Sequence, residues 1–506
     1  MGFTQQHLFH EQYGPDPEGW VVVPSNAQFD PTGSGTATSS NSSIDDLSNA
    51  GSLSQMPIPS WYWLNSNQLY STGTTRAVMI PDFRYTNPST GRIFCMNDNP
   101  KSLMTGNATF QNTTAELAGQ ISTDGGDSFT QSGVTMPTST ISGSVSSSDG
   151  PRDWATNGDS SSPIWIIVAS FYPNNQTNYS GSSNLQIYRS TNLTTWSRVI
   201  VPADRNSTFN GSGTNRINQF IESITWSTDR FIIFEGRSGA ISWSYTGLAN
   251  TWSSWYMPTS GTHMWNGGDN NRESRGFFRI RSNNGGSKVL LLHQMDNQTS
   301  PYLRTHYSSD KGQTWDSGNY VGTDNYYRKY HNITYIDGMV NVGNSQVGPG
   351  VWVITGARYG RGYQGRLTYE ELMAYSTNGT SWTEIDIPND VTPSELSQGQ
   401  YAEMPTIIDT KKGKFLMFKR VGMSDYYGTD RTHIYMSNNS LTDWERVVTS
   451  PFLSTNGDQW MSAGYDVRAR NSVFFYNDRL YVLLNEKNGG SVMEELQGRV
   501  AYLQFK

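Results

Sequence analysis

Acidic, basic and imidazole side chains stand at or near the start of several strand-like runs, where they could do chemistry. They are Asp153 in RDW, Glu222 in ESITW, Glu273 in RESRG, His331 in KYHNI, Arg358 in TGARYGRGYQGR, Glu403 in AEMP, and Asp466 with Arg468 in GYDVRA. Two carboxylates held about 5–10 Å apart can act as acid and base on a glycosidic bond. In the alternative interpretation these polar groups line a water-filled channel, pair with one another and make only passive contact with a ligand.

The strand-like runs belong to an internal repeat. In each copy a β-rich run is followed by Ser-x-Asp or Ser-x-Asn, a few small or polar residues and an aromatic residue. The copies begin at residues 122, 190, 244, 308, 376 and 437. Their spacing averages about 63 residues, which is too even for chance pairs of serine and tryptophan. The repeat therefore predicts a set of similar units that each contain the same corner.

The repeated motif resembles the Asp-box, or BNR repeat, of sialidase-type β-propellers, which reads Ser-x-Asp-x-Gly-x-Thr-Trp. The copy at Ser308 fits it in full, the copy at Ser122 nearly fits, and the copy at Ser244 is the most degraded. The matched box residues are Ser122, Asp124, Gly126, Phe129, Ser190, Asn192, Trp196, Ser308, Asp310, Gly312, Trp315, Ser376, Asn378, Trp382, Ser437, Asn439 and Trp444. The resemblance spans roughly residues 110–450 and implies an all-β propeller.

The box has a local physical meaning. Asp or Asn accepts hydrogen bonds from the backbone amides of its own turn, glycine takes the positive-φ position and the aromatic ring folds back onto the hairpin. In the family this corner joins the third and fourth strands of a blade at the outer rim. We therefore expect the box residues to be structural. If its ring is buried, Trp315→Ala should cost about 3–5 kcal/mol of stability.

The boxes divide the chain into an N-terminal arm, residues 1–60, and a β-propeller, residues 61–506. At about 63 residues a unit, the propeller should have seven blades, with six as the alternative. Closing the ring requires one more strand, and GWVVVPS at residues 19–25 is the candidate donor. The Ser- and Gly-rich segment 31–55 has no core of its own, so we expect order there only where the propeller or a neighbouring subunit holds it.

The family resemblance also specifies what a sialidase needs. Three arginines hold the substrate carboxylate, a glutamate activates a tyrosine nucleophile, and an aspartate is the acid/base. The first arginine stands just before a proline, but here Arg76 lies further from Pro81 than the family motif allows, and Arg84 follows the proline. Arg358 is a candidate for a later arginine, although its loop could equally be solvated. Because no Tyr–Glu pair stands out, we assign no catalytic residue.

The composition excludes several classes of protein. Cys95 is the only cysteine, which rules out an internal disulfide framework and a cysteine-based zinc cluster. The seven histidines show no paired metal-ligand spacing, and no phosphate loop is present, so no metal or cofactor is expected. A net charge of −7 without a basic tail argues against nucleic acid as a partner. The absence of a long apolar run argues against membrane insertion.

The first residues lack the basic start and apolar core of a secretory signal. Together with the single cysteine and the Asn-, Ser-, Thr- and Gly-rich composition, this is similar in style to bacteriophage tail, nozzle and spike proteins. We therefore expect a non-catalytic structural or host-recognition protein of a virion, assembled in the host cytoplasm. Its partners would be other virion proteins or copies of itself, and a host surface glycan is a further potential ligand.

The alternatives are a sialidase-like glycoside hydrolase or a glycan-binding lectin, with a cytoplasmic or non-classically released location. A glycan could stack on aromatic residues such as Trp252 and Trp255, which could instead pack inside a blade.

Overall fold

The chain folds into β-strands. The computed structural model describes, with short gaps, residues 77–98, 114–201, 221–256, 279–321, 327–387, 403–449 and 473–505, and short strands at 17–22, 37–38 and 459–461. Apart from strands, the regular elements in these residues are two 3₁₀ turns, Pro88–Thr90 and Ala249–Thr251. The prediction of an all-β fold is confirmed. None of the described helices has the length and apolar character of a membrane span.

Seven antiparallel sheets of three to five strands account for most of the described strands, and we number them in chain order. The first three sheets are β3 (Ala77–Pro81), β4 (Ile93–Asp98) and β6 (Leu117–Ser122); β10 (Pro151–Thr156), β11 (Trp165–Ser170), β13 (Leu185–Ser190) and β14 (Trp196–Ile200); and β15 (Ile221–Ser227), β16 (Arg230–Glu235) and β17 (Ile241–Ser244). The fourth sheet is β18 (Arg279–Ser282), β19 (Val289–Met295), β20 (Tyr302–Ser308) and β21 (Asn319–Tyr320).

The fifth sheet is β22 (Tyr327–Ile336), β25 (Val351–Arg361), β26 (Leu367–Ser376) and β27 (Thr383–Ile385), and the sixth is β28 (Glu403–Asp409), β29 (Phe415–Val421), β30 (Arg431–Ser437) and β31 (Glu445–Thr449). The seventh sheet is β1 (Pro17–Val22), β35 (Leu496–Phe505), β34 (Arg479–Lys487) and β32 (Gln459–Met461), with β33 (Val473–Tyr476) also paired to β34. Two-stranded pairs join β2 (Ala37–Thr38) to β7 (Ser128–Phe129), β5 (Thr114–Ala115) to β8 (Ser139–Thr140), β9 (Val145–Ser146) to β12 (Tyr172–Pro173), and β23 (Val340–Val342) to β24 (Ser345–Val347).

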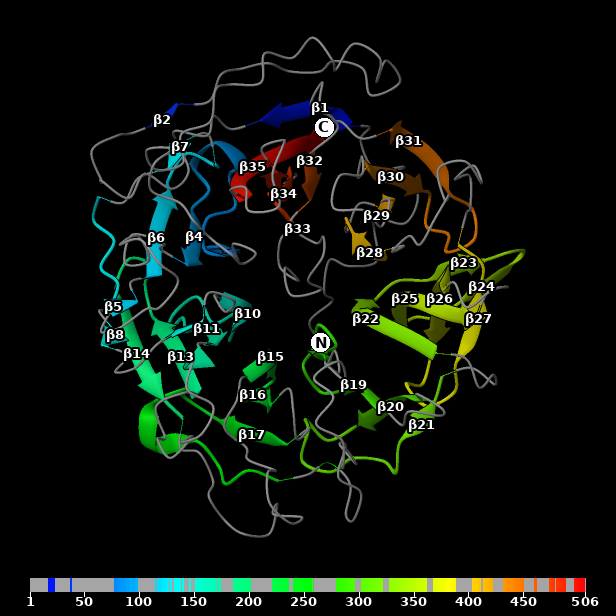
Figure 1. Ribbon diagram of the computed structural model, residues 1–506, viewed down its shortest axis with the longest axis horizontal. Helices are drawn as coiled ribbons and strands as arrows, with labels where there is room; N and C mark the ends of the chain where they lie inside the picture. Colours follow the sequence, from blue (N-terminus) through cyan, green and yellow to red (C-terminus); the bar gives the residue numbers. More distant parts are fainter. Residues whose placement is uncertain are drawn as a thin grey trace, which may run out of the picture.

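The sheets follow one another around a common centre, with the first strand of each of the first six sheets closest to it (Figure 1). Neighbouring inner strands contact each other in the order β3, β10, β15, β18, β22, β28 and β33. β34 of the seventh sheet in turn contacts β3 of the first. Residues that start successive inner strands are therefore brought together although they are far apart in the sequence.

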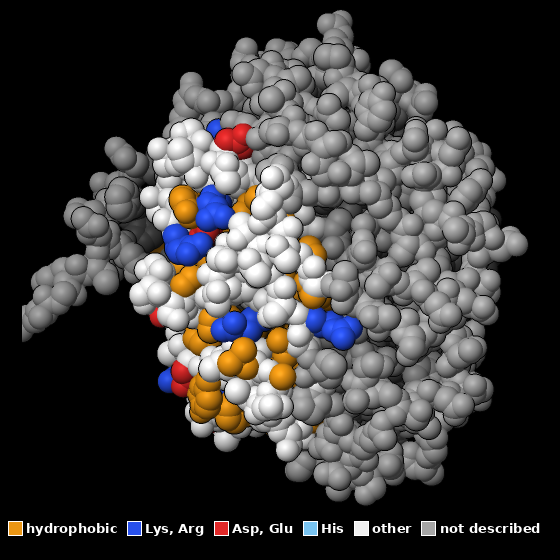
Figure 2. All heavy atoms as spheres, turned by 90° about the vertical axis from the view of Figure 1, so that its left-hand side faces the viewer, with side chains coloured by type: hydrophobic (Ala, Val, Ile, Leu, Met, Phe, Trp, Pro, Cys, Tyr) orange, Lys and Arg blue, Asp and Glu red, His pale blue; other side chains and the backbone are white. Residues whose placement is uncertain are grey.

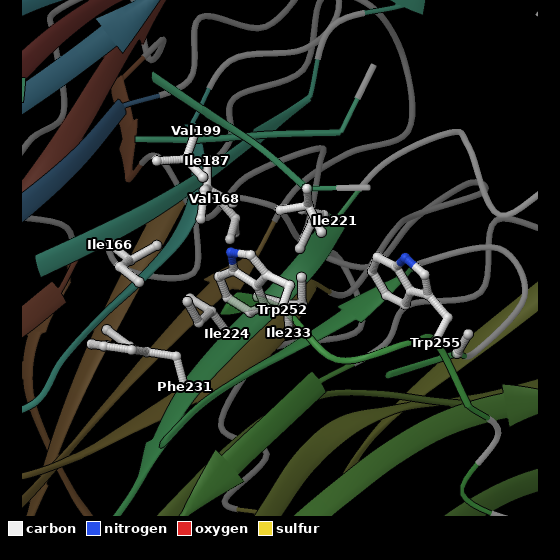
Figure 3. Packing of buried hydrophobic residues seen from close by; sticks show 13 residues of the cluster. Ile166, Val168, Ile187, Val199, Ile221, Ile224, Phe231, Ile233, Trp252 and Trp255 are labelled. Atoms are coloured by element: carbon white, nitrogen blue, oxygen red, sulfur yellow. The ribbon is translucent and has the colours of Figure 1, made fainter. Parts of the chain in front are cut away.

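The core lies between adjacent sheets because the second strand of each sheet is apolar on both faces. All six residues of β16 are buried, and Ile166, Val168 and Ile233 pack into one cluster between the second and third sheets (Figure 3). Trp252 and Trp255 belong to this cluster and are 9% and 4% exposed. The interpretation that these two rings pack inside the core is therefore confirmed, and the alternative, stacking on a sugar, is not.

Each box corner rests on the sheet before its own. A Cβ atom added to Gly247, Gly312 or Gly379 would collide with Ile166, Ile232 or Tyr307 of the preceding sheet. In the second sheet, which carries the box at Ser190, Trp196 packs on Phe94 of the first sheet with ring centroids 4.7 Å apart. The sixth box pairs with β23, which lies between β22 and β25 in the sequence: the Asn341 amide donates to the Asn439 carbonyl at 2.8 Å.

The seventh sheet contains both the first and the last strand of the chain. β1 pairs with β35 in antiparallel register, with Pro17 opposite Phe505 and Val22 opposite Ala501. The first box rests on this sheet, since Arg479 and Tyr481 of β34 donate to the Gly125 carbonyl at 2.7 and 2.6 Å. Of the low-complexity segment 31–55, the described residues are β2, which pairs with β7 at the end of the first box.

Candidate functional site

Four inner strands carry a β-bulge, which lies at the start of β10, β15 and β28 and halfway along β22. The extra residue is Arg152 in β10, Glu222 in β15 and His331 in β22, and in β28 it lies between Glu403 and Thr406. A bulge turns a side chain out of the regular alternation and is frequent beside active sites. Three of the residues singled out from the sequence, Glu222, His331 and Glu403, therefore lie at or directly beside a bulge.

Hydrogen bonds between sheets show that these bulges lie at matching heights. Ser223 Oγ, one residue after the bulge of β15, donates to the carboxylate of Asp153, one residue after the bulge of β10, at 2.6 Å. Thr334 Oγ1 of β22 donates to the Ile407 carbonyl of β28 at 2.9 Å, and both residues follow their bulges by a similar number of positions. The bulge of β10 is thus aligned with the bulge of β15, and the bulge of β22 with the bulge of β28.

Asp153 joins three sheets. Its carboxylate is fully buried and accepts hydrogen bonds from two groups of the third sheet, the Ser223 hydroxyl and the Ile224 amide, the latter at 3.2 Å. From the fourth sheet, Nη1 of Arg281 donates to Oδ2 at 2.7 Å and Nη2 to Oδ1 at 3.2 Å. Nη1 of Arg281 also donates to Ser223 Oγ at 3.2 Å. This cluster of Asp153, Ser223 and Arg281 fixes the backbone directly behind two of the bulges.

The electrostatics of the cluster determine what Asp153 can do. Burial raises the pKa of its carboxyl, but the charges of Arg281 and Arg279 and the hydrogen bonds from Arg281 and Ser223 outweigh burial and lower the pKa to about 2. At neutral pH Asp153 is therefore a paired carboxylate with no proton to donate. It positions its neighbours rather than serving as a general acid.

The other residues singled out from the sequence lie on other strands or outside the described residues. Arg358 lies on β25, the second strand of the fifth sheet, opposite Arg328 of β22, and not on an innermost strand. Glu403 opens β28 opposite Arg420. Glu273, Asp466 and Arg468 lie outside the described residues. Ser223, Arg281 and the bulge residue Arg152 were not among the sequence candidates. The only sequence signal for Ser223 and Arg281 is that polar and apolar residues alternate along β15 and β18.

The box corners have the geometry of self-bonded turns. In the fourth box, Asp310 Oδ1 accepts from the amides of Gln313 and Thr314 at 3.1 and 2.8 Å, and Ser308 Oγ accepts from the Gly312 amide at 2.8 Å. Asn192 and Asn378 accept from their turn amides in the same way.

Two boxes deviate from the sequence assignment. In the third box the hydroxyl of Thr246 replaces the carboxylate and accepts from the Leu248 amide at 3.3 Å. In the sixth box Ser440, and not Asn439, accepts from the amides of Thr442 and Asp443, whereas Asn439 takes the positive-φ position at 52°. The role assigned to Asn439 from the sequence alignment of the boxes is therefore shifted by one residue.

Among the described residues, no group of three or more His, Cys, Asp or Glu side chains is arranged to hold a metal ion. No family model and no curated protein matches the chain.

Solved structures with a similar arrangement of strands have low sequence identity to the chain. They include an α-L-arabinofuranosidase of Fusarium graminearum in complex with arabinobiose, which is 11% identical, covers 86% of this chain and 94% of its own, and has a TM-score of 0.39. An α-L-arabinanase of Penicillium chrysogenum is 10% identical over 70% of this chain and 93% of its own, with a TM-score of 0.36. A subtype N11 neuraminidase-like protein of A/flat-faced bat/Peru/033/2010 (H18N11) is 8% identical over 70% of this chain and 86% of its own, with a TM-score of 0.36. At these values the likeness assigns neither a family nor an activity.

Proposed function

We propose that the protein is a glycoside hydrolase built on a seven-bladed β-propeller, with Glu222 and Glu403 as its acid and base. The observation that carries the proposal is the alignment of bulges on the inner strands. These bulges put Glu222 and Glu403 at the starts of β15 and β28, and His331 halfway along β22, on strands that surround the centre.

The contacts between sheets support the proposed blade count. The seven sheets are the blades, and the first box rests on the seventh sheet as the other boxes rest on the sheet before them. The pairing of β1 with β35 supports a last blade whose outermost strand is β1, which would close the ring without a long free edge. In this arrangement the inner strands would surround a central funnel.

Glycoside hydrolysis suits two glutamates on separate strands. One carboxyl protonates the glycosidic oxygen, and the other, as a carboxylate, activates water or attacks the sugar. β15 and β28 lie on opposite sides of the centre in Figure 1, so a sugar in the funnel would lie between them. The Asp153 cluster, which is ionised and paired, holds the β15 bulge in place and takes no part in proton transfer.

Turnover of fluorogenic substrates tests the proposal. The purified protein is incubated with sialosides, arabinofuranosides, mannosides and other glycosides. Glu222→Gln and Glu403→Gln should each lower kcat by at least about 100-fold, because each removes one partner of the acid–base pair. Glu384→Gln, on the exposed outer strand β27, is the matched control and should leave kcat unchanged. Absence of turnover throughout the panel, or full activity in both inner-strand variants, would refute the proposal.

The interpretation as a non-catalytic virion protein stays a prediction, since no described residue bears on virion partners or location. It requires assembly, and so a solution mass at the monomer with a protease-sensitive segment 31–55 would count against it. If the wild type turns over a glycoside and the Glu222 or Glu403 variant does not, the hydrolase interpretation would replace the virion interpretation.

A further inference from the structure

The third box presents an aromatic surface that the other boxes lack. Its second residue, Tyr245, is 50% exposed, and Leu248 in the same turn is 46% exposed. The equivalent second residues of the other boxes are all small, polar and exposed: Thr123, Thr191, Ser309, Thr377 and Asn438. The corner therefore folds without a large side chain at this position, and the fold gives no reason for a tyrosine there.

Tyr245 is held in a fixed orientation. Its ring meets the ring of Trp243, two residues earlier on β17, at 5.0 Å between centroids and an angle of 69°. The guanidinium of Arg230 lies 4.7 Å from the Trp243 centroid and 5.2 Å from the Tyr245 centroid. Arg230 is itself only 6% exposed and is fixed by Asp229, whose Oδ1 accepts from its Nε at 2.8 Å. These contacts hold the Tyr245 and Trp243 rings in place, so the two side chains lose little conformational freedom when a ligand binds.

Charged groups stand beside the rings. The Asp229 carboxylate and the Lys311 ammonium are 3.4 Å apart, and both side chains are 38% exposed. Figure 2 shows the side of the molecule that includes the first sheets, where hydrophobic side chains reach the surface next to Lys, Arg, Asp and Glu. An exposed ring flanked by hydrogen-bonding groups matches a sugar, whose C–H face packs on an aromatic ring while its hydroxyls bond at the rim.

We propose that Tyr245, Trp243, Asp229 and Lys311 form a second glycan-binding site on the rim of the molecule. Tyr245 would stack on one sugar ring, and Asp229 and Lys311 would bond its hydroxyls. Two exposed side chains provide far less area than the roughly 800 Å² per partner of a stable protein interface, and this favours a sugar over a protein as the occupant.

This rim site is separate from the inner-strand glutamates. Asp229 follows β15, whereas Glu222 lies at the start of that strand, about 20 Å away along it. The inference deepens the proposed function, since a site remote from the centre would hold a polymeric glycan while the centre acts on it. Its test measures binding and does not depend on turnover.

Affinity electrophoresis in gels that contain arabinan, mannan or polysialic acid provides the test. At least one polymer should retard the wild-type protein. Tyr245→Thr, which introduces the residue type of the first, second and fifth boxes, should weaken that binding about tenfold, the equivalent of one lost ring contact. Tyr245→Phe should retain the retardation, because the hydroxyl is not needed for stacking.

Two further variants separate the site from the rest of the molecule. Glu222→Gln should be retarded like the wild type even if turnover is lost, so failure of the proposed hydrolysis leaves this test intact. Tyr85→Thr, at the exposed tyrosine in the connection between β3 and β4, is the matched control and should also be retarded. The rim site is refuted if no polymer retards the wild type or if Tyr245→Thr is retarded equally in every polymer that binds.

Discussion

At the scale of single residues, the buried carboxylate of Asp153 should make stability depend on pH. Its pKa is about 2 in the folded protein and roughly 3.9 in an unfolded chain. As the pH falls, the unfolded chain therefore binds the proton first. The stabilisation is complete above about pH 5 and is lost between about pH 4 and pH 2, and it amounts to about 2 kcal/mol.

Urea denaturation at pH 6 and at pH 2.5 measures this effect. Asp153→Asn should be destabilised by about 2–4 kcal/mol at pH 6, because Arg281 loses its partner, and should lose less on acidification than the wild type. Asp386→Asn, at an exposed position, should behave like the wild type. An Asp153→Asn protein with wild-type stability at pH 6 would contradict the role of the cluster.

Two tryptophans of the boxes should differ in what their removal costs. Trp196 is 3% exposed, donates from Nε1 to the Leu193 carbonyl at 3.0 Å and packs on Phe94, so Trp196→Ala should cost about 3–5 kcal/mol. Trp315 is partly exposed, and the condition of burial attached to its sequence prediction is not met. Trp315→Ala should cost about 1–3 kcal/mol. Chemical denaturation of both variants checks the order, and equal losses would contradict it.

At the scale of elements, the box corner packs tightly against the preceding sheet. Gly379 and Gly413 have nearly equal φ angles of 78° and 74°, but an added Cβ meets the Tyr307 ring at Gly379 and nothing within 4 Å at Gly413. Gly413→Ala should therefore cost about 1–2 kcal/mol for backbone strain alone. Gly379→Ala should cost about 1–3 kcal/mol more, because Tyr307 must move. Thermal and urea unfolding compare the two variants, and equal costs would mean that the corner does not press on the preceding sheet.

The sequence predicted these elements well where the signal was local. The box turns and strand pairs such as β15–β16 and β28–β29 repeat short patterns of apolar, polar and aromatic residues. The bulges had no such signal, because one extra residue in a strand leaves the pattern of side chains almost unchanged. Trp252 and Trp255 were open to both interpretations, because serine neighbours are compatible with a surface and with a tight turn over a core.

The cluster behind the bulges was missed for a different reason. Asp153 and Arg281 are 128 positions apart, and their contact exists only because three inner strands lie next to one another. No periodicity along one chain encodes such a pair. Charge, burial and direction of each side chain had to come from the structure.

At the scale of the whole molecule, β1 should stabilise the chain as the partner of β35. Removal of residues 1–24 leaves β35 with one unpaired edge and should lower the melting temperature by several degrees and promote association. A synthetic peptide of residues 16–25 should restore part of the loss when added in excess, because it can occupy the same edge. A truncated protein that melts with the wild type would show that the seventh sheet does not depend on β1.

The pairing of Pro17 with Phe505 also sets where the polypeptide can be cut. Since β1 and β35 lie side by side in one sheet, a short linker could join these two residues. New termini could then be opened in the connection between any two consecutive sheets. In every such circular permutant each sheet would keep its neighbouring sheets, so the fold would not depend on where the polypeptide begins.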